Sequence, residues 1–137
     1  METTVSAQTR DVVNEFLKRM EEGDVPGVVA LFAADAHWEI PGDPEIVPWA
    51  GRRTVAGIPD FFQTMNRLTV RELFEIERVV VDRPNAVLIG RGRVAVRSTG
   101  KAIDTPFAVD IVVNAEGRIS RFYMFEDSWG VALAMRP

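Results

Sequence analysis

The order of the sequence patterns predicts an α+β fold, in which three helices near the N-terminus pack against one face of a curved antiparallel sheet. Apolar residues recur at helical spacing in three segments between residues 7 and 68. From residue 70 onward, apolar and polar residues instead alternate in four segments joined by short turn sequences. A short helix over Ser128–Met135 closes the chain. The sheet must wrap one face over the helices if both layers are to bury their apolar sides.

Three helices are expected in the first half of the chain. The first covers residues 7–22, and Gly23 suits the left-handed residue that follows a helix. Asp24 is expected to cap the second helix, with Pro26 in its first turn. The third helix begins near Gly57, after which apolar residues again recur with helical spacing.

Five strands are expected: Ala36–Ile40, Val70–Val81, Ala86–Ser98, Ile103–Val113 and residues 118–127. In the first strand Trp38 and Ile40 share one face, and His37 and Glu39 take the other, because successive strand side chains alternate. The segment Asp43–Arg53 has no period and is expected to be a loop.

A turn at Thr99-Gly100 is expected to place Gly92 opposite Val109 in the neighbouring strand. One face of the sheet then carries Gly90, Gly92, Val94, Phe107, Val109 and Ile111, and continues onto Phe122, Met124 and Glu126. The other face carries Arg91, Arg93, Arg97, Asp110, Arg121 and Tyr123. In this register Arg91 lies across from Asp110, an opposite-charge pair that favours strand pairing.

The composition excludes several classes of protein. The 137 residues fit a single domain, 1–137, that can bury a sizeable core without a disulfide or a metal. The absence of cysteine and the single histidine exclude thiolate catalysis and Cys- or His-rich metal sites. With a net charge of −4, the chain lacks the basic excess typical of nucleic-acid binders.

Other sequence signals are absent as well. No apolar run approaches the ~20 residues that span a bilayer, so no membrane partner is expected. The N-terminus has no secretory signal, and a cytoplasmic location is expected. Neither a Gly-rich phosphate loop nor a His–carboxylate cluster occurs, so no cofactor and no metal are expected.

Glu126 is the candidate catalytic residue. It shares a strand face with Phe122 and Met124, which places one acid on an apolar surface. Burial raises the pKa of such a carboxyl, by as much as ~3–5 units when it is complete, and suits it to general acid–base catalysis near neutral pH. The alternative to a catalytic role is that Glu126, at the end of its strand, lies in water or forms an ion pair with an arginine. Asp127 points the other way and is expected to cap the C-terminal helix.

Two stretches carry a family resemblance. The first is Gly23-Asp24-x-x-Gly27-x-x-x-Leu31-Phe32-Ala33-x-Asp35-Ala36-x-x-Glu39-x-Pro41, and the second comprises Thr99-Gly100-Lys101, Glu116-Gly117-Arg118-Ile119 and Asp127. The chain resembles the SnoaL-like and ketosteroid-isomerase-related branch of the nuclear-transport-factor-2-like superfamily. The resemblance implies a cone-shaped sheet with a cavity between sheet and helices, and a homodimer formed through the outer sheet face. This fold hosts isomerases, cyclases, epoxide hydrolases, dehydratases and binding proteins.

The catalytic residues of those relatives are not retained. Phe16, Ile40 and Val109 stand where ketosteroid isomerases, by this resemblance, place a tyrosine and two aspartates. Met124 stands where epoxide hydrolases and several cyclases place an acid. Neither Arg91 nor Arg93 is followed by an aspartate two residues later, so the Arg–Asp pair of epoxide hydrolases is absent too.

These observations favour a small-molecule enzyme of SnoaL-like type, with isomerase, cyclase or dehydratase chemistry on a mostly apolar substrate and Glu126 as acid or base. A non-catalytic binding protein for an apolar ligand is the alternative, and a structural or partner-docking domain is the third. The expected ligand pocket comprises Phe16, Trp38, Ile40, Phe62, Gly92, Phe107, Val109, Phe122, Met124 and Trp129. The expected dimer face comprises Arg91, Arg93, Asp110, Arg121 and Tyr123.

Overall fold

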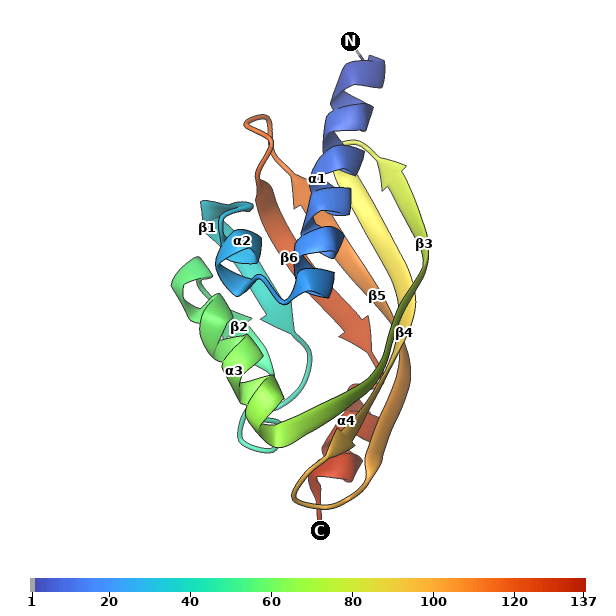
Figure 1. Cartoon of the computed structure of the whole chain (residues 1–137). Coiled ribbons are helices and arrows are strands. Elements are labelled where there is room, and N and C mark those ends of the chain that lie inside the picture. The colour runs from blue at the N-terminus through green and yellow to red at the C-terminus, as the bar shows by residue number, and fades with distance from the viewer. Residues whose placement is uncertain (1) are drawn as a thin grey trace.

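The computed structural model describes residues 2–137, with side chains from residue 8 onward. Its helices are α1 (Glu2–Glu22), α2 (Val25–Val29), α3 (Ile58–Leu68) and α4 (Ser128–Met135), with a short 3-10 helix, η1, at Val55–Gly57. Its strands are β1 (Phe32–Ile40), β2 (Gly51–Arg53), β3 (Thr69–Asp82), β4 (Asn85–Val96), β5 (Ala102–Val113) and β6 (Ile119–Glu126). The predicted α+β fold is confirmed: α1, α2 and α3 lie on one side of a curved sheet, and α4 lies at its far end (Figure 1).

The sheet has six strands in the order β2-β1-β6-β5-β4-β3. Strands β3 to β6 form antiparallel pairs, as expected, but β1 pairs with β6 in parallel, so the sheet is mixed. The parallel pair arises because the chain passes through α3 and three further strands before β6 returns beside β1. The loop expected over Asp43–Arg53 contains a strand at its end, since Gly51–Arg53 pairs with the end of β1.

Local sequence signals set the helix boundaries. The Asp24 carboxylate accepts a hydrogen bond from the Gly27 backbone N–H at 3.0 Å, which confirms it as the cap of α2, and Pro26 lies in the first turn. Gly23, with φ of 69°, follows α1 in the left-handed conformation that glycine adopts readily. Helix α1 begins at Glu2, earlier than its apolar stripe predicted.

An aromatic cluster joins the helices to the sheet. Trp38 on β1 stacks on Phe122 on β6, with ring centroids 4.2 Å apart and planes 8° apart. Phe16 on α1 contacts Phe122 at 5.5 Å, and Phe61 on α3 contacts Trp38 at 5.1 Å. The face alternation expected for β1 is confirmed, because Trp38 and Ile40 are buried whereas the other face is partly exposed. These aromatic rings fix the positions of α1 and α3 on the sheet.

The register between β4 and β5 differs from the expected one by four residues. Gly92 lies opposite Thr105, and Val109 lies opposite Leu88. The loop of this hairpin covers residues 97–100, and Gly100, with φ of 73°, is its last residue rather than its centre. A shift of four residues preserves side-chain alternation, so the strand residues expected on each face remain on it. The expectation for Arg97 is wrong, because β4 ends at Val96 and Arg97 lies in the hairpin loop.

Candidate functional site

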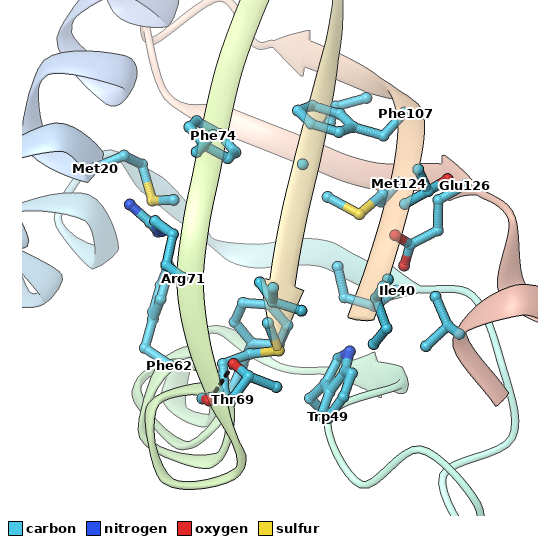
Figure 2. A pocket seen from close by; sticks show the side chains of 18 of the residues that line it. Met20, Ile40, Trp49, Phe62, Thr69, Arg71, Phe74, Phe107, Met124 and Glu126 are labelled. Carbon is cyan, nitrogen blue, oxygen red and sulfur yellow. Dashed lines mark hydrogen bonds between the residues drawn. The ribbon is translucent and has the colours of Figure 1, made fainter. Parts of the chain in front are cut away.

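A cavity of about 170 Å³ lies between the helices and the inner face of the sheet. Its walls are mostly apolar, and Figure 2 shows side chains from α1, α3 and strands across the sheet converging on it. The lining residues are Phe16, Met20, Trp38, Ile40, Trp49, Phe61, Phe62, Met65, Asn66, Thr69, Arg71, Leu73, Phe74, Leu88, Gly92, Val94, Ile103, Thr105, Phe107, Val109, Phe122, Met124, Glu126 and Val131.

The cavity collects nearly all the residues expected in a pocket. Phe16, Trp38, Ile40, Phe62, Gly92, Phe107, Val109, Phe122 and Met124 all line it. Trp129 does not, and the expectation for this residue is wrong: its side chain is 68% exposed. Helix α4 begins at Ser128, and its rotation turns Val131 rather than Trp129 toward the cavity.

Glu126 carries the acid in the cavity lining. It lies opposite Phe107 in the β5–β6 ladder and points toward the cavity space beside Met124 and Ile40 (Figure 2). Within the described part of the chain, its carboxyl group forms no hydrogen bond or ion pair. Burial raises its pKa from the ordinary 4.5 to about 7, and the neighbouring negative charge of Asp127 adds to this increase.

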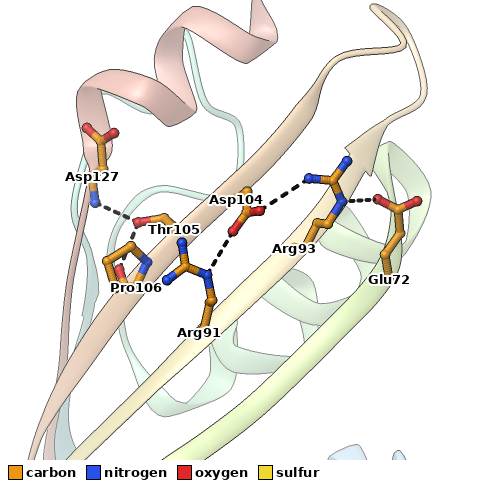
Figure 3. A network of polar contacts seen from close by, with 7 residues as sticks. All are labelled: Glu72, Arg91, Arg93, Asp104, Thr105, Pro106 and Asp127. Atoms are coloured by element: carbon orange, nitrogen blue, oxygen red, sulfur yellow. Dashed lines mark hydrogen bonds and ion pairs between the residues drawn. The ribbon is translucent and has the colours of Figure 1, made fainter.

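Asp127 has a separate structural role. Its carboxylate accepts a hydrogen bond from the Gly130 backbone N–H at 3.0 Å and caps α4, as the sequence predicted. Its own N–H donates to the Thr105 hydroxyl at 3.2 Å, as Figure 3 shows. The cap therefore fixes a second negative charge next to Glu126, on the opposite side of the strand.

The remainder of the wall offers few groups that could share the chemistry. Phe16, Ile40, Val109 and Met124 line the cavity with apolar side chains. The buried Nε1 of Trp38 has no hydrogen-bond partner within residues 8–137, which makes it an unsatisfied donor beside the cavity. Among the described residues, no group of three or more His, Cys, Asp or Glu side chains could hold a metal ion.

Sequence reasoning missed one charged residue of the lining, Arg71. The sequence predicts a regular alternation of apolar and polar residues in this strand, but β3 contains a bulge between Arg71 and Leu73 that changes which side chains face inward. Phe74 was missed for the same reason. No residue type in this segment signals the bulge, so the sequence pattern could not have revealed it.

The outer face of the sheet carries ordered ion pairs instead of a cavity. Asp104 accepts hydrogen bonds from Arg91 Nε at 3.1 Å and from Arg93 Nη1 at 3.2 Å, and Glu72 accepts one from Arg93 Nε at 3.1 Å (Figure 3). The expected Arg91–Asp110 pair is therefore wrong, because the corrected register places Pro106 opposite Arg91. These contacts join β3, β4 and β5.

A second polar cluster lies farther along the same face. Asp110 pairs with Arg121 at 2.8 Å, and the Arg121 guanidinium lies over the Tyr123 ring. The His37 ring stacks on Tyr123, and its Nε2 lies 3.1 Å from Glu39 Oε1. Although burial opposes it, hydrogen bonds from Tyr123, His37 and Arg52 lower the pKa of Glu39. Glu39 therefore stays ionised on the outer face, in contrast to Glu126 inside.

Within residues 2–137, no helix is both long and apolar enough to span a bilayer.

Two fungal proteins resemble part of the chain. Patulin biosynthesis cluster protein F of Penicillium expansum is 30% identical over 90 residues, which cover 64% of this chain and 45% of that protein. Patulin synthesis protein F of Aspergillus clavatus is 31% identical over 90 residues, which cover 64% of this chain and 46% of that protein. The chain thus spans about half the length of the curated relatives it matches.

Solved structures and a family profile agree on the fold. An NTF2-like protein from Burkholderia xenovorans superimposes with a TM-score of 0.84 over 96% of this chain and 98% of that one, at 23% identity. A candidate polyketide cyclase from Xanthomonas campestris superimposes with a TM-score of 0.73 over 96% of this chain and 98% of that one, at 14% identity. The profile of the SnoaL-like domain matches residues 13–122. The fold is therefore that of the NTF2-like proteins, and the chain belongs to the SnoaL-like domain family.

Proposed function

We propose that this chain is an enzyme that transfers a proton on a small, mostly apolar substrate, with isomerase, cyclase or dehydratase chemistry and no cofactor. The observation that carries the proposal is the carboxyl group of Glu126, which lines an apolar cavity without a hydrogen-bond or ion-pair partner among the described residues. Its pKa of about 7 leaves both protonation states populated at neutral pH. A general acid or base is most effective when its pKa lies near the working pH.

A single carboxyl group is sufficient for this class of reaction. As a carboxylate, Glu126 takes a proton from a carbon next to a carbonyl group. As the resulting acid, it returns a proton to another atom of the same substrate, which regenerates the carboxylate and leaves the charge of the protein unchanged. The apolar walls lower the local dielectric constant, which strengthens electrostatic interactions at the carboxyl group.

The comparisons support this class without specifying the reaction. The family profile is that of the SnoaL-like domain, and a structural neighbour is a candidate polyketide cyclase. The curated relatives are proteins of patulin biosynthesis, in which small molecules are made. These likenesses favour a role in small-molecule conversion.

The test is proton exchange into a substrate panel. Single-ring ketones and cyclic 1,3-diketones are incubated with the protein in D2O, and loss of the α-proton signals is followed by NMR. We expect the natural protein to accelerate exchange for part of the panel and Glu126→Gln to abolish the acceleration. Glu75→Gln, which alters an exposed acid on β3 outside the cavity lining, serves as the matched control. Equal exchange by the natural protein and Glu126→Gln contradicts the proposal.

A non-catalytic binding protein is the second candidate, and the apolar lining favours it. Glu126 has no second acid or base beside it in the part of the lining formed by Phe16, Ile40, Val109 and Met124. A binding protein retains ligands from the same panel and exchanges none of their protons. Binding with no acceleration in the natural protein therefore selects this second candidate.

We also propose that the outer sheet face mediates a homodimer. Arginines alternate with carboxylates across this face, so a second copy related by a two-fold axis can meet opposite charges. Phe125 adds an exposed aromatic ring, stacked on Tyr123 at 4.8 Å. Arg91, Arg93, Asp110, Arg121 and Tyr123 are the residues proposed for the interface.

A further inference from the structure

The bulge in β3 gives the cavity a cation that strand alternation alone would not place there. Arg71 lies opposite Val94, and Phe74 lies opposite Gly92, so Glu72 is an extra residue in this strand. Val94 and Gly92 are two apart and share the inner face of β4. Arg71 and Phe74, three apart, therefore share that face as well, and both line the cavity.

Arg71 differs from the arginines of β4 and β6 in its partners. Arg91, Arg93 and Arg121 each pair with a carboxylate on the outer face. Within residues 8–137, Arg71 forms no ion pair, and its guanidinium lies over the Phe74 ring, 5.2 Å from the centroid. This contact holds the cation at the cavity while leaving its hydrogen-bond donors available.

The two charged groups of the lining lie apart. Figure 2 shows Arg71 beside Met20 and Phe62, on the opposite side of the cavity from Glu126. The wall between them is largely aromatic and aliphatic. Arg71 is also exposed, so its end of the cavity is in contact with water. A ligand that satisfies both ends needs an acidic group at one end and a reactive apolar part at the other.

The volume limits the size of the apolar part. A cavity of about 150 Å³ lined by aliphatic and aromatic side chains holds one benzene molecule. The cavity here, about 170 Å³, is only slightly larger. One six-membered ring with a small substituent fits inside, and a longer substituent must extend toward the exposed end.

We infer that the cavity binds single-ring, mostly apolar molecules that carry a carboxylate, with the carboxylate paired to Arg71 and the ring held toward Glu126. This inference deepens the proposed function by naming its substrate class, and its use of Glu126 rests on that proposal. Arg71 is a specificity residue in this arrangement. It holds one end of the substrate, and the proton transfer takes place at the other.

The test measures binding, independently of turnover. The probes are benzoate, phenylacetate, 3-phenylpropionate and 4-phenylbutyrate, each compared with its neutral carboxamide. Binding is followed by tryptophan fluorescence, because Trp38 and Trp49 line the cavity, and by calorimetry. We expect at least one carboxylate to bind about tenfold more tightly than its amide, as a hydrogen-bonded ion pair at a partly exposed site allows. High salt should reduce this preference, because Arg71 is exposed.

Variants assign the preference to Arg71. Arg71→Gln is expected to abolish the preference for carboxylate over amide while leaving amide binding unchanged, and Arg71→Lys should restore part of it. Arg78→Gln removes the same charge from the same strand outside the cavity lining and should keep the full preference. Thermal unfolding of each variant shows whether it is folded. If Arg71→Gln does not fold, Arg71→Lys still shows whether the preference for carboxylate over amide depends on this side chain.

Three results would each overturn the inference. The first is that no probe binds the natural protein, and the second is that amides bind as tightly as carboxylates. The third is that Arg71→Gln retains the same preference for carboxylate over amide as Arg78→Gln does. Failure of the proposed function is distinguishable. In that case Glu126→Gln leaves proton exchange unchanged while the carboxylate preference remains dependent on Arg71, and the chain is a binding protein for aromatic acids.

Discussion

Glu126 and Phe107 lie directly opposite each other in the β5–β6 ladder, and both face the cavity. The Phe107 ring stacks on Phe74, with centroids 5.6 Å apart. The carboxyl group thus lies in a mostly apolar lining and forms no hydrogen bond or ion pair among the described residues. This arrangement is the physical origin of its raised pKa, because an apolar environment penalises the charged form.

The raised pKa of Glu126 should appear as a pH dependence of stability. Between pH 4.5 and about 7, the folded protein binds this proton more tightly than the unfolded chain does. The free energy of unfolding therefore falls by at most about 3 kcal/mol as pH rises through this interval, and it levels off above pH 7. Urea unfolding of the natural protein and of Glu126→Gln, compared at each pH, isolates this contribution. A difference that is constant from pH 4 to 8 contradicts the raised pKa.

Replacing Asp127 separates its two effects. Asp127→Asn removes the negative charge beside Glu126 but keeps a side chain that caps helices well. We expect the pKa of Glu126 to fall toward, but not to, its ordinary value, because burial is the larger cause of the increase. Carbon-13 NMR titration of the glutamate carboxyl groups measures this change directly.

Asp127→Ala is the matched comparison. It removes the same charge and also the hydrogen bond to the Gly130 N–H, so it should lower stability by about 1 kcal/mol more than Asp127→Asn. Equal stability of the two variants would show that the cap contributes nothing to α4.

The elements that sequence reasoning located well are those with strong local signals. The apolar stripe of α3 and the capping aspartates, Asp24 and Asp127, depend on neighbouring residues only, and the structure has them as predicted. The division of the sheet into an apolar and a charged face also held, because it depends only on alternation. Glu126 could be identified as a candidate for the same reason.

The features that were missed depend on contacts distant in sequence. The β4–β5 register was wrong because Gly100 ends the hairpin loop instead of lying at its centre. The parallel pairing of β1 with β6 joins segments about 85 residues apart, for which no local pattern exists. Arg71 reaches the cavity through a bulge, and alternation counted along the strand cannot anticipate an extra residue.

Two neighbouring glycines on β4 should respond differently to substitution. A methyl group on Gly90 would collide with the backbone oxygen of Glu75 and lie 2.9 Å from the Phe107 ring. Gly90→Ala should therefore destabilise the protein by about 1–3 kcal/mol, as overpacking does. At Gly92 the nearest atoms are 3.8 Å away, so Gly92→Ala should cost little. Thermal and urea unfolding compare the two.

Gly92 also allows the cavity to be filled. Gly92→Leu places a large apolar side chain on a lining position, so we expect it to block the aromatic acids and amides alike. Gly92→Ala is its control and should retain binding. Undiminished binding by a folded Gly92→Leu variant would show that the ligand occupies a different part of the protein.

Self-association through the outer sheet face is expected to depend on Phe125, whose side chain is 53% exposed and stacks on Tyr123. Phe125→Ser removes apolar surface from this face without opening the core, because the side chain is exposed. The natural protein should sediment as a dimer, and the variant should shift toward monomer with little change in thermal stability. Trp129→Ser is the matched control, because Trp129 is also exposed but belongs to α4 rather than to the sheet. A monomeric natural protein would contradict the proposed dimer. A dimer weakened by Trp129→Ser and not by Phe125→Ser would place the dimer contact outside the outer sheet face.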